Sequence, residues 1–337
     1  MKRIVGYLRH RRDAALLLAA FLLLVIAIFQ PSIPVQRNIY SYLLVADISQ
    51  SMNVVDATIN GKPATRIALT QKMLHDVIAS MPCGTRVSIG LFAGVSVAAL
   101  YTPIEVCENY AAIQDTIDHL DWRTAWSGNS RVRTSMLSLA RTLRSFSEPA
   151  QVVYFTDGEE APRLHTFNTE NLTNFQGGSG WLLVGVGSEK GTAIPKLDEK
   201  NQLIGYWAGD SFAMQPGVAQ ISEANVGVRT DNVAGGESDR YLSKLDEDYL
   251  KSLAKEVGGF YVHGDSLQSI LTAMKQQKPA RRDIAPFVLD WLLATMAGLI
   301  LISAYLPRHP IKQLRASLDA LKQSRQKPQS PPGAEAG

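Results

Sequence analysis

The stretch LLVADISQSMNVVD, from Leu43 to Asp56, decides both the fold and the candidate site of this chain. An apolar, β-prone run ends at Asp47, and Ser49 and Ser51 follow at alternate positions. In open α/β sheets, ligands bind beyond the carboxyl ends of the strands. Because alternate residues of an extended or turning loop can point the same way, we expect these three oxygen-bearing side chains to converge.

A second carboxylate follows another apolar run, in the stretch VVYFTDGEE. Asp157 comes directly after the predicted strand 151–156. Carboxylates and hydroxyls form a hard, oxygen-only ligand set, which suits Mg²⁺ or Ca²⁺ and is poor for Zn²⁺. The alternative for the first triplet alone is an N-cap and turn cluster. Two strand-end aspartates in one chain favour a divalent-cation site.

The pattern between residues 40 and 277 alternates short β-prone runs with helical periodicity, which predicts an α/β fold with a doubly wound, mainly parallel sheet. Gly94 separates two strands as a hairpin, so one edge strand should be antiparallel. The segment 188–240 is rich in Gly, Asn and Asp and predicts a hairpin-bearing insertion. The expected strands are 40–46, 86–93, 95–101, 151–156, 181–186 and 259–263, and the expected helices are 66–81, 109–120, 132–146, 246–257 and 265–277.

The composition excludes two broad classes of protein. The chain has 337 residues, of which 46% are hydrophobic, so it is too apolar to be disordered. Its net charge of +3 gives no case for binding nucleic acid.

Each end of the chain carries an apolar run of 16 residues, at 14–29 and 291–306. A membrane-spanning helix needs about 20 residues. Flanking residues extend the runs to 14–35 and 284–306, and we therefore expect two transmembrane helices. The alternatives are a cleaved signal peptide for the first run and a buried core helix for the second. No small-x-small cleavage motif follows the first run, and Pro307 with basic residues ends the second.

Basic residues set the expected orientation. Five Lys or Arg precede the first run, and Arg37 alone follows it closely, so the positive-inside rule places the N-terminus in the cytoplasm. The expected organisation is a basic cytoplasmic N-terminus (1–13), a transmembrane helix (14–35), an extracytoplasmic domain (36–283), a second transmembrane helix (284–306) and a cytoplasmic, partly disordered tail (307–337).

The motifs DISQS and TDGE resemble the metal-ion-dependent adhesion site of von Willebrand factor A (vWA) domains. The resemblance covers residues 40–277 and implies a divalent cation, Mg²⁺ or Ca²⁺, as cofactor. It also implies a third loop within SGNSRVRTSMLSLA, where Ser130 stands in place of the usual threonine. Arg133 falls where the family often has glycine, and this would change access to the metal.

Further stretches resemble bacterial membrane-anchored vWA proteins: SM after the serines, Asp56, VGVGSEKGTAIP and SKLDEDYLKSLAKEVGGFYV. The resemblance is to Bat proteins and to the accessory proteins encoded with periplasmic methanol dehydrogenase. It implies an inner-membrane protein with a periplasmic vWA domain that helps to assemble or mature a periplasmic, calcium-dependent enzyme. A Bat-type stress-tolerance scaffold is the alternative. The expected partners of this chain are a periplasmic enzyme and other membrane vWA or accessory proteins.

A hydrolase is the rival class. Neither Ser49 nor Ser51 lies in G-x-S-x-G, and H-E-x-x-H and G-x-x-x-x-G-K-[ST] are absent from the sequence. We therefore expect a binding module in which a partner's carboxylate completes the metal coordination. Ordinary loop packing is the alternative role for the two tryptophans of DWRTAW. The candidate partner contacts are Trp122, Arg123, Trp126, Arg133 and Glu159.

Cys83 and Cys107 are the only cysteines. Cys83 precedes the strand 86–93, and Cys107 follows the strand that returns antiparallel to it. Both should lie at the end of the sheet remote from the cation site. An oxidising compartment favours a disulfide between them over two separate thiols.

Overall fold

The computed structural model of the chain describes residues 2–164, 166, 169–212 and 232–305. The chain divides into two compact units. One unit spans Asn38–Asp283, and the other joins the two ends of the chain. The predicted tail 307–337 lies outside the described residues.

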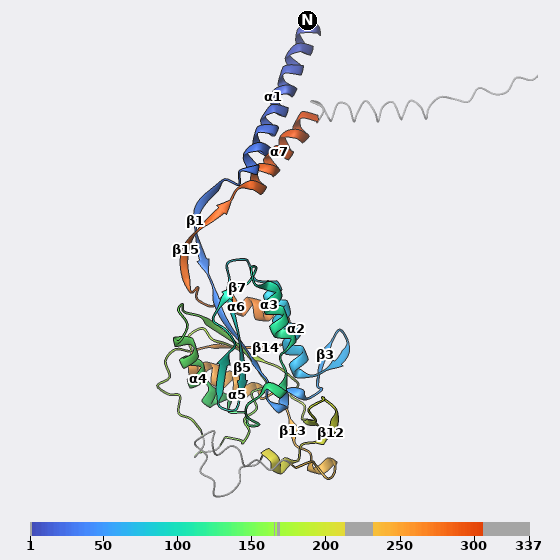
Figure 1. Cartoon of the computed structure of the whole chain (residues 1–337), viewed down its shortest axis with the longest axis vertical. Helices are drawn as coiled ribbons and strands as arrows, with labels where there is room; N and C mark the ends of the chain where they lie inside the picture. Colours follow the sequence, from blue (N-terminus) through green and yellow to red (C-terminus); the bar gives the residue numbers. More distant parts are fainter. Residues whose placement is uncertain (1, 165, 167–168, 213–231, 306–337) are drawn as a thin grey trace, which may run out of the picture. The chain divides into compact units, whose positions relative to one another are not determined.

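The larger unit is built on one mixed sheet with the strand order β14-β9-β8-β2-β5-β6, and β7 also pairs with β5 (Figure 1). The pairings among β14, β9, β8, β2 and β5 are parallel, whereas β6 and β7 run antiparallel to β5. The α/β prediction with an antiparallel edge is therefore confirmed. The strands are β2 (Ser41–Asp47), β5 (Arg86–Ala93), β6 (Ser96–Ala99), β7 (Ile104–Glu105), β8 (Gln151–Thr156), β9 (Leu182–Gly185) and β14 (Phe260–His263).

Helices cover both faces of this sheet, and each face has its own apolar core. Every residue of β2 is buried, as expected for a central parallel strand. Its successive side chains divide between the faces: Leu44 belongs to one core and Leu43 to the other. On the first face lie α2 (Arg66–Ala79), α3 (Tyr110–Asp118) and α6 (Leu267–Met274), and on the second lie α4 (Val132–Arg144) and α5 (Glu247–Val257).

The strand register aligns the candidate site. Asp47, the last residue of β2, is opposite Phe92 of β5, and Ala46 is opposite Phe155 of β8. The parallel strands β2, β5 and β8 therefore end at the same edge of the sheet. Loops that follow these three strands begin side by side.

Two pieces of irregular structure lie outside the sheet. The insertion, predicted as 188–240, extends to Ser243 in the structure. It contains the antiparallel pair β11 (Pro195–Leu197) and β12 (Leu203–Tyr206), and its two ends pair through β10 (Thr192–Ala193) and β13 (Leu242–Ser243). A small hairpin of β3 (Ala57–Ile59) and β4 (Lys62–Ala64) was not predicted. Its turn is Asn60-Gly61, with φ of 52° and 77°, and an Asn-Gly pair is a recognised hairpin signal.

The structure corrects the predicted bounds of the two terminal helices. The first, α1 (Lys2–Ile28), stops before Pro31, and β1 (Ser32–Ile39) follows it. The second, α7 (Asp290–Tyr305), is preceded by β15 (Arg281–Val288), which pairs with β1. Pro31, Pro34 and Pro286 explain the difference, because proline lacks the N–H that a helix interior needs.

In this terminal unit α1 and α7 lie side by side, with Ala20 and Ala297 buried (Figure 1). Over the part of the chain that the structure describes, we find no helix that is both long and apolar enough to cross a membrane.

Candidate cation and partner site

The loop after β2 brings together Asp47, Ser49 and Ser51. The Ser49 N–H donates to Asp47 Oδ1 at 2.8 Å, and the Ser49 and Ser51 hydroxyls lie 3.1 Å apart. All three residues are buried. The other carboxylate oxygen of Asp47 accepts a hydrogen bond from Thr156 Oγ1 at 2.7 Å, so the end of β8 helps to hold Asp47 in place.

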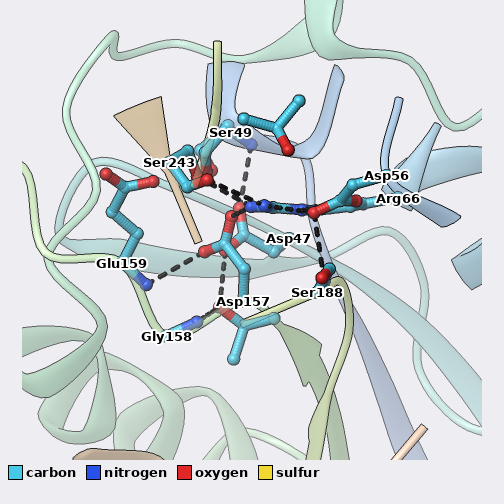
Figure 2. A network of polar contacts seen from close by, with 12 residues as sticks. Asp47, Ser49, Asp56, Arg66, Asp157, Gly158, Glu159, Ser188 and Ser243 are labelled. Carbon is cyan, nitrogen blue, oxygen red and sulfur yellow. Dashed lines mark hydrogen bonds and ion pairs between the residues drawn. The ribbon is translucent and has the colours of Figure 1, made fainter. Parts of the chain in front are cut away.

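Asp157 directly follows β8 and is fully buried. Its Oδ1 accepts from the Glu159 N–H at 2.9 Å, and its Oδ2 pairs with Arg66 Nη1 at 2.7 Å (Figure 2). Its backbone carbonyl accepts from the Asp246 N–H at the start of α5. Both oxygens of this carboxylate therefore already have hydrogen-bond donors.

Arg66 is a site residue that the sequence analysis did not single out. It begins α2 after the N-cap Thr65, and its side chain is fully buried. Its guanidinium pairs with Asp56, at 2.7 Å from Nη2 to Oδ2, as well as with Asp157. Nη1 also donates to Ser243 Oγ at 2.7 Å. An arginine in the first turn of a helix is ordinarily exposed, and its sequence position carries no sign of this burial.

The electrostatics of the site are those of crowded buried carboxylates. Burial and repulsion from Asp157 raise the pKa of Asp47 to about 7, although hydrogen bonds from Ser49 and Thr156 oppose the shift. Burial works against the charge of Arg66, but Asp157 and Asp56 outweigh it and raise the Arg66 pKa above its ordinary value. One guanidinium thus pairs with two of the three carboxylates, Asp56 and Asp157, and Asp47 has no cationic partner among the described residues.

Ser130 lies in the loop that the resemblance identified, between α3 and α4 and two residues before α4. It is 3% exposed, and its hydroxyl has no hydrogen-bond partner within the described residues. Its backbone is well anchored: Ser130 N donates to Ala161 O at 3.0 Å, and Ala161 N donates to Ser130 O at 2.7 Å. A buried polar group without a partner is unusual in proteins. A cation is a suitable partner for this hydroxyl oxygen.

The oxygen atoms of these side chains are suitable ligands for a hard divalent cation. Asp47 offers a carboxylate, and Ser49, Ser51 and Ser130 offer hydroxyls, which are ligand types that Mg²⁺ and Ca²⁺ accept. Within the described ranges, no three ligand atoms from His, Cys, Asp or Glu converge at this edge of the sheet. Hydroxyls would therefore supply part of the ligand set.

Four of the five candidate partner-binding residues form hydrogen bonds or ion pairs with other residues of this chain. Trp122, in the short helix η2 (Trp122–Thr124), donates from Nε1 to Asn201 Oδ1 at 2.7 Å. Arg123 Nη1 donates to Glu199 O at 2.9 Å. Both reach the turn between β11 and β12. Arg133 pairs with Glu256, and Glu159 donates its N–H to Asp157. Trp126 remains 44% exposed.

Cys83 and Cys107 lie at the other end of the sheet. They form a disulfide with a Cα–Cα distance of 5.3 Å. Cys83 precedes Arg86, which is opposite Glu105 at the start of β5, whereas the candidate site lies beyond the end of β2.

Comparison with known proteins agrees with this fold. Residues 42–160 match the family model of the von Willebrand factor type A domain. The chain therefore contains a domain of this family. The matched segment runs from β2 to the loop after β8 and includes all five predicted cation-site residues.

No curated protein matches the chain. One similar solved structure is an aerotolerance-related membrane protein from Bacteroides fragilis, with 18% identity, 71% of this chain and 98% of that chain covered, and a TM-score of 0.48. Another is the ArnB paralog VWA2 from Sulfolobus acidocaldarius, with 14% identity, coverage of 73% and 47%, and a TM-score of 0.37. A third is a von Willebrand factor type A protein from Catenulispora acidiphila, with 9% identity, coverage of 78% and 43%, and a TM-score of 0.38.

Proposed function

We propose that this chain is a membrane-anchored, extracytoplasmic vWA protein that binds a divalent cation and, through it, an acidic group of a protein partner. The observation that carries the proposal is the convergence of Asp47, Ser49 and Ser51 at the edge of the sheet, with their side chains buried together. Ser130 would add a third hydroxyl. Mg²⁺ and Ca²⁺ are the expected ions.

The charge balance of the site supports a divalent ion. Asp47, Asp56 and Asp157 bring three carboxylates, and Arg66 brings one compensating charge. Carboxylates buried without full compensation are costly. A divalent cation would supply the two positive charges that Arg66 does not. In this arrangement Arg66 holds Asp157, and Thr156 holds Asp47, so that both carboxylates stay oriented toward the site.

The same geometry favours binding over catalysis. Three histidines of the described residues pair with acids elsewhere: His75 with Asp118, His119 with Asp115 and His263 with Glu247. None of these pairs includes a serine of the site, and a serine nucleophile needs a base within hydrogen-bond reach. A partner carboxylate, in contrast, needs only an open coordination position on the cation.

Membrane attachment is proposed from the two ends of the chain. The paired helices α1 and α7 leave large apolar side chains exposed, among them Phe21, Leu22, Leu299 and Ile302. Basic residues in the first half of α1, before its apolar run, favour a cytoplasmic N-terminus. A reporter that is active only outside the cytoplasm should be active when fused after residue 200 and inactive after residue 320. The reverse pattern would show that the orientation is wrong.

The proposed biological role is an accessory factor in the assembly or metal maturation of a periplasmic enzyme such as methanol dehydrogenase. It rests on the resemblance of VGVGSEKGTAIP and the segment 243–262 to bacterial membrane vWA proteins. A Bat-type scaffold rests on the same residues. Co-purification from native membranes, with and without a chelator, separates the two roles by the partner that is recovered.

Calorimetric titration of the full chain with Mg²⁺ and Ca²⁺ tests the cation site. Asp47→Asn keeps the size of the side chain but removes its charge, and it should abolish the binding heat. Asp115→Asn is the matched control, since this carboxylate is 76% exposed on α3 and, among the described residues, forms an ion pair with His119 alone. Equal cation affinity in the Asp47→Asn and wild-type proteins would rule the site out.

A further inference from the structure

Both ends of the insertion reach the same buried ion pair. Ser188, where the insertion begins, donates its N–H to Asp56 Oδ2 at 3.0 Å. Ser243, where it ends, accepts from Arg66 Nη1 through its hydroxyl and from Nη2 through its carbonyl, at 2.7 and 3.4 Å. Asp56 and Arg66 are joined to each other at 2.7 Å. Figure 2 shows these four residues in one continuous network.

The same guanidinium also holds a carboxylate of the candidate cation site. Arg66 Nη1 donates to Asp157 Oδ2 and to Ser243 Oγ, both at 2.7 Å. A single nitrogen therefore connects the loop after β8 with the end of the insertion. The space around Arg66 is tight: a Cβ added at Gly187, just before the insertion, would lie 2.5 Å from Arg66 Nε. A movement of Arg66 would therefore disturb both Asp157 and Ser243.

The insertion in turn forms much of the surface beside the site. It lines a cavity of about 1260 Å³ together with the loop after Ser51 and the N-terminal half of α2. Leu203 and Leu242 of the insertion and Val55 of that loop line this cavity, and each is more than half exposed. Apolar side chains gathered in a hollow next to a binding site are suited to contact a partner.

We infer that Arg66 is a positioning residue that couples the cation site to the insertion. When cation binding shifts Asp157, the conformational order of the backbone at residues 188–191 and 242–245 should change with it. This inference rests on the proposed cation site and adds to it a route to the partner-facing surface. Because such coupling is reciprocal, a partner that orders the insertion would strengthen cation binding by the same factor. A simple structural ion pair would hold the insertion equally in the presence and absence of the cation.

Hydrogen exchange of the full chain tests the first half of the inference without a cation. Ser243→Ala removes the hydrogen bond from Arg66 Nη1 and the hydrogen bond of the Ser243 hydroxyl to Glu159, and it leaves the predicted cation ligands and both salt bridges of Arg66 in place. A hydrogen bond to a charged group contributes about 1.5–3 kcal/mol, so exchange at 188–191 and 242–245 should become roughly 10- to 150-fold faster. Ser211→Ala, which removes another buried hydroxyl of the insertion, is the control and should leave these amides unchanged. Unchanged exchange in Ser243→Ala would show that Arg66 does not hold the ends of the insertion, and it would overturn the inference.

The second half is tested by adding Ca²⁺ or Mg²⁺ and measuring binding heat and exchange on the same samples. In the wild-type protein the cation should slow exchange at both ends of the insertion. In Ser243→Ala it should still bind, with affinity within about threefold, but most of the slowing should be lost. Binding heat without slowing in the wild type, or equal slowing in Ser243→Ala, would overturn the inference alone. Absence of binding heat in the wild type would overturn the proposed cation site and the coupling with it.

Discussion

The two ends of the central sheet are held together by different forces. At the carboxyl end, Asp47, Asp56, Asp157 and Arg66 form a buried network of charges and hydrogen bonds. At the amino end, the Cys83–Cys107 disulfide closes a 24-residue separation between the start of β5 and the segment after β7. A bound ion or a change in protonation can alter the charge network at the carboxyl end, whereas the amino end is held by a covalent bond. The candidate site lies at the adjustable end.

Removing the central charge of the network should have the largest effect on stability. Arg66→Gln leaves Asp56 and Asp157 buried without their counter-charge. Breaking a buried pair by removing one partner costs about 3–5 kcal/mol, and we expect a loss of this size in the free energy of unfolding, measured by urea denaturation.

Arg86→Gln is the matched control at the amino end of the sheet. Arg86 pairs with Glu148 at 3.3 Å, and its side chain is 36% exposed, so its loss should cost about 1 kcal/mol or less. Equal losses in the two variants would show that the two ends do not differ in the way the burial of their charges implies.

The amino end should lose stability when its covalent link is removed. Closing a loop of this length contributes about 3 kcal/mol in the chain-entropy model. The double variant Cys83→Ser/Cys107→Ser should lose about this amount in denaturant unfolding, with cation binding unchanged. A reducing agent should lower the stability of the wild-type protein and have no effect on the double variant. No response of the wild type to reduction would mean that the disulfide is absent or makes no contribution.

The sequence predicted the parts of the site that are local in the chain. Asp47, Ser49 and Ser51 are neighbours, and Asp157 directly follows a strand, so hydrophobic patterning was enough to place all four at one edge of the sheet. Arg66 was missed because its partners Asp157 and Ser243 are 91 and 177 residues away. A pairing over such distances depends on the tertiary structure and leaves no local pattern.

The predicted bounds of the terminal helices failed for a different reason, which is local. Hydrophobicity extended both terminal helices into 30–35 and 284–289, but these segments contain prolines and form the β1–β15 pair. The β3–β4 hairpin, by contrast, carried a readable signal in Asn60-Gly61. In both places proline or glycine, which restrict or free the backbone, marked the local structure better than hydrophobicity did.

The two ends should also respond to pH in opposite directions, and this is the smallest effect that we predict. At the carboxyl end, burial raises the pKa of Glu160 to about 7, although hydrogen bonds from Tyr249 and from the Arg133 N–H oppose the shift. The folded protein therefore binds this proton more tightly than the unfolded chain. Protonated Glu160 therefore makes its full contribution to the free energy of unfolding below pH 4.5, and this contribution is lost as the pH rises to about 7.

At the amino end the sign is reversed. Burial works to raise the pKa of Glu105, but hydrogen bonds from the backbone N–H groups of Glu108, Gly84 and Cys107 outweigh it and lower the pKa. Glu105 therefore stabilises the fold above its unfolded pKa, and this stabilisation is lost as the pH falls. The two carboxyl groups thus favour the folded state in different pH ranges.

Urea denaturation between pH 4 and pH 8 separates the two contributions. Glu160→Gln keeps a hydrogen-bond acceptor for Tyr249 but cannot titrate, so it should remove a decline in stability on the order of 2 kcal/mol between about pH 4.5 and 7. Glu105→Gln should instead flatten the low-pH side of the profile and leave the neutral decline in place. Asp47 and Glu159 also have raised pKa values, so some of the neutral decline should persist in Glu160→Gln. A Glu160→Gln profile parallel to that of the wild type would mean that Glu160 is ionised in the folded protein across this range, with Arg131 at 3.8 Å supplying enough positive charge to stabilise it.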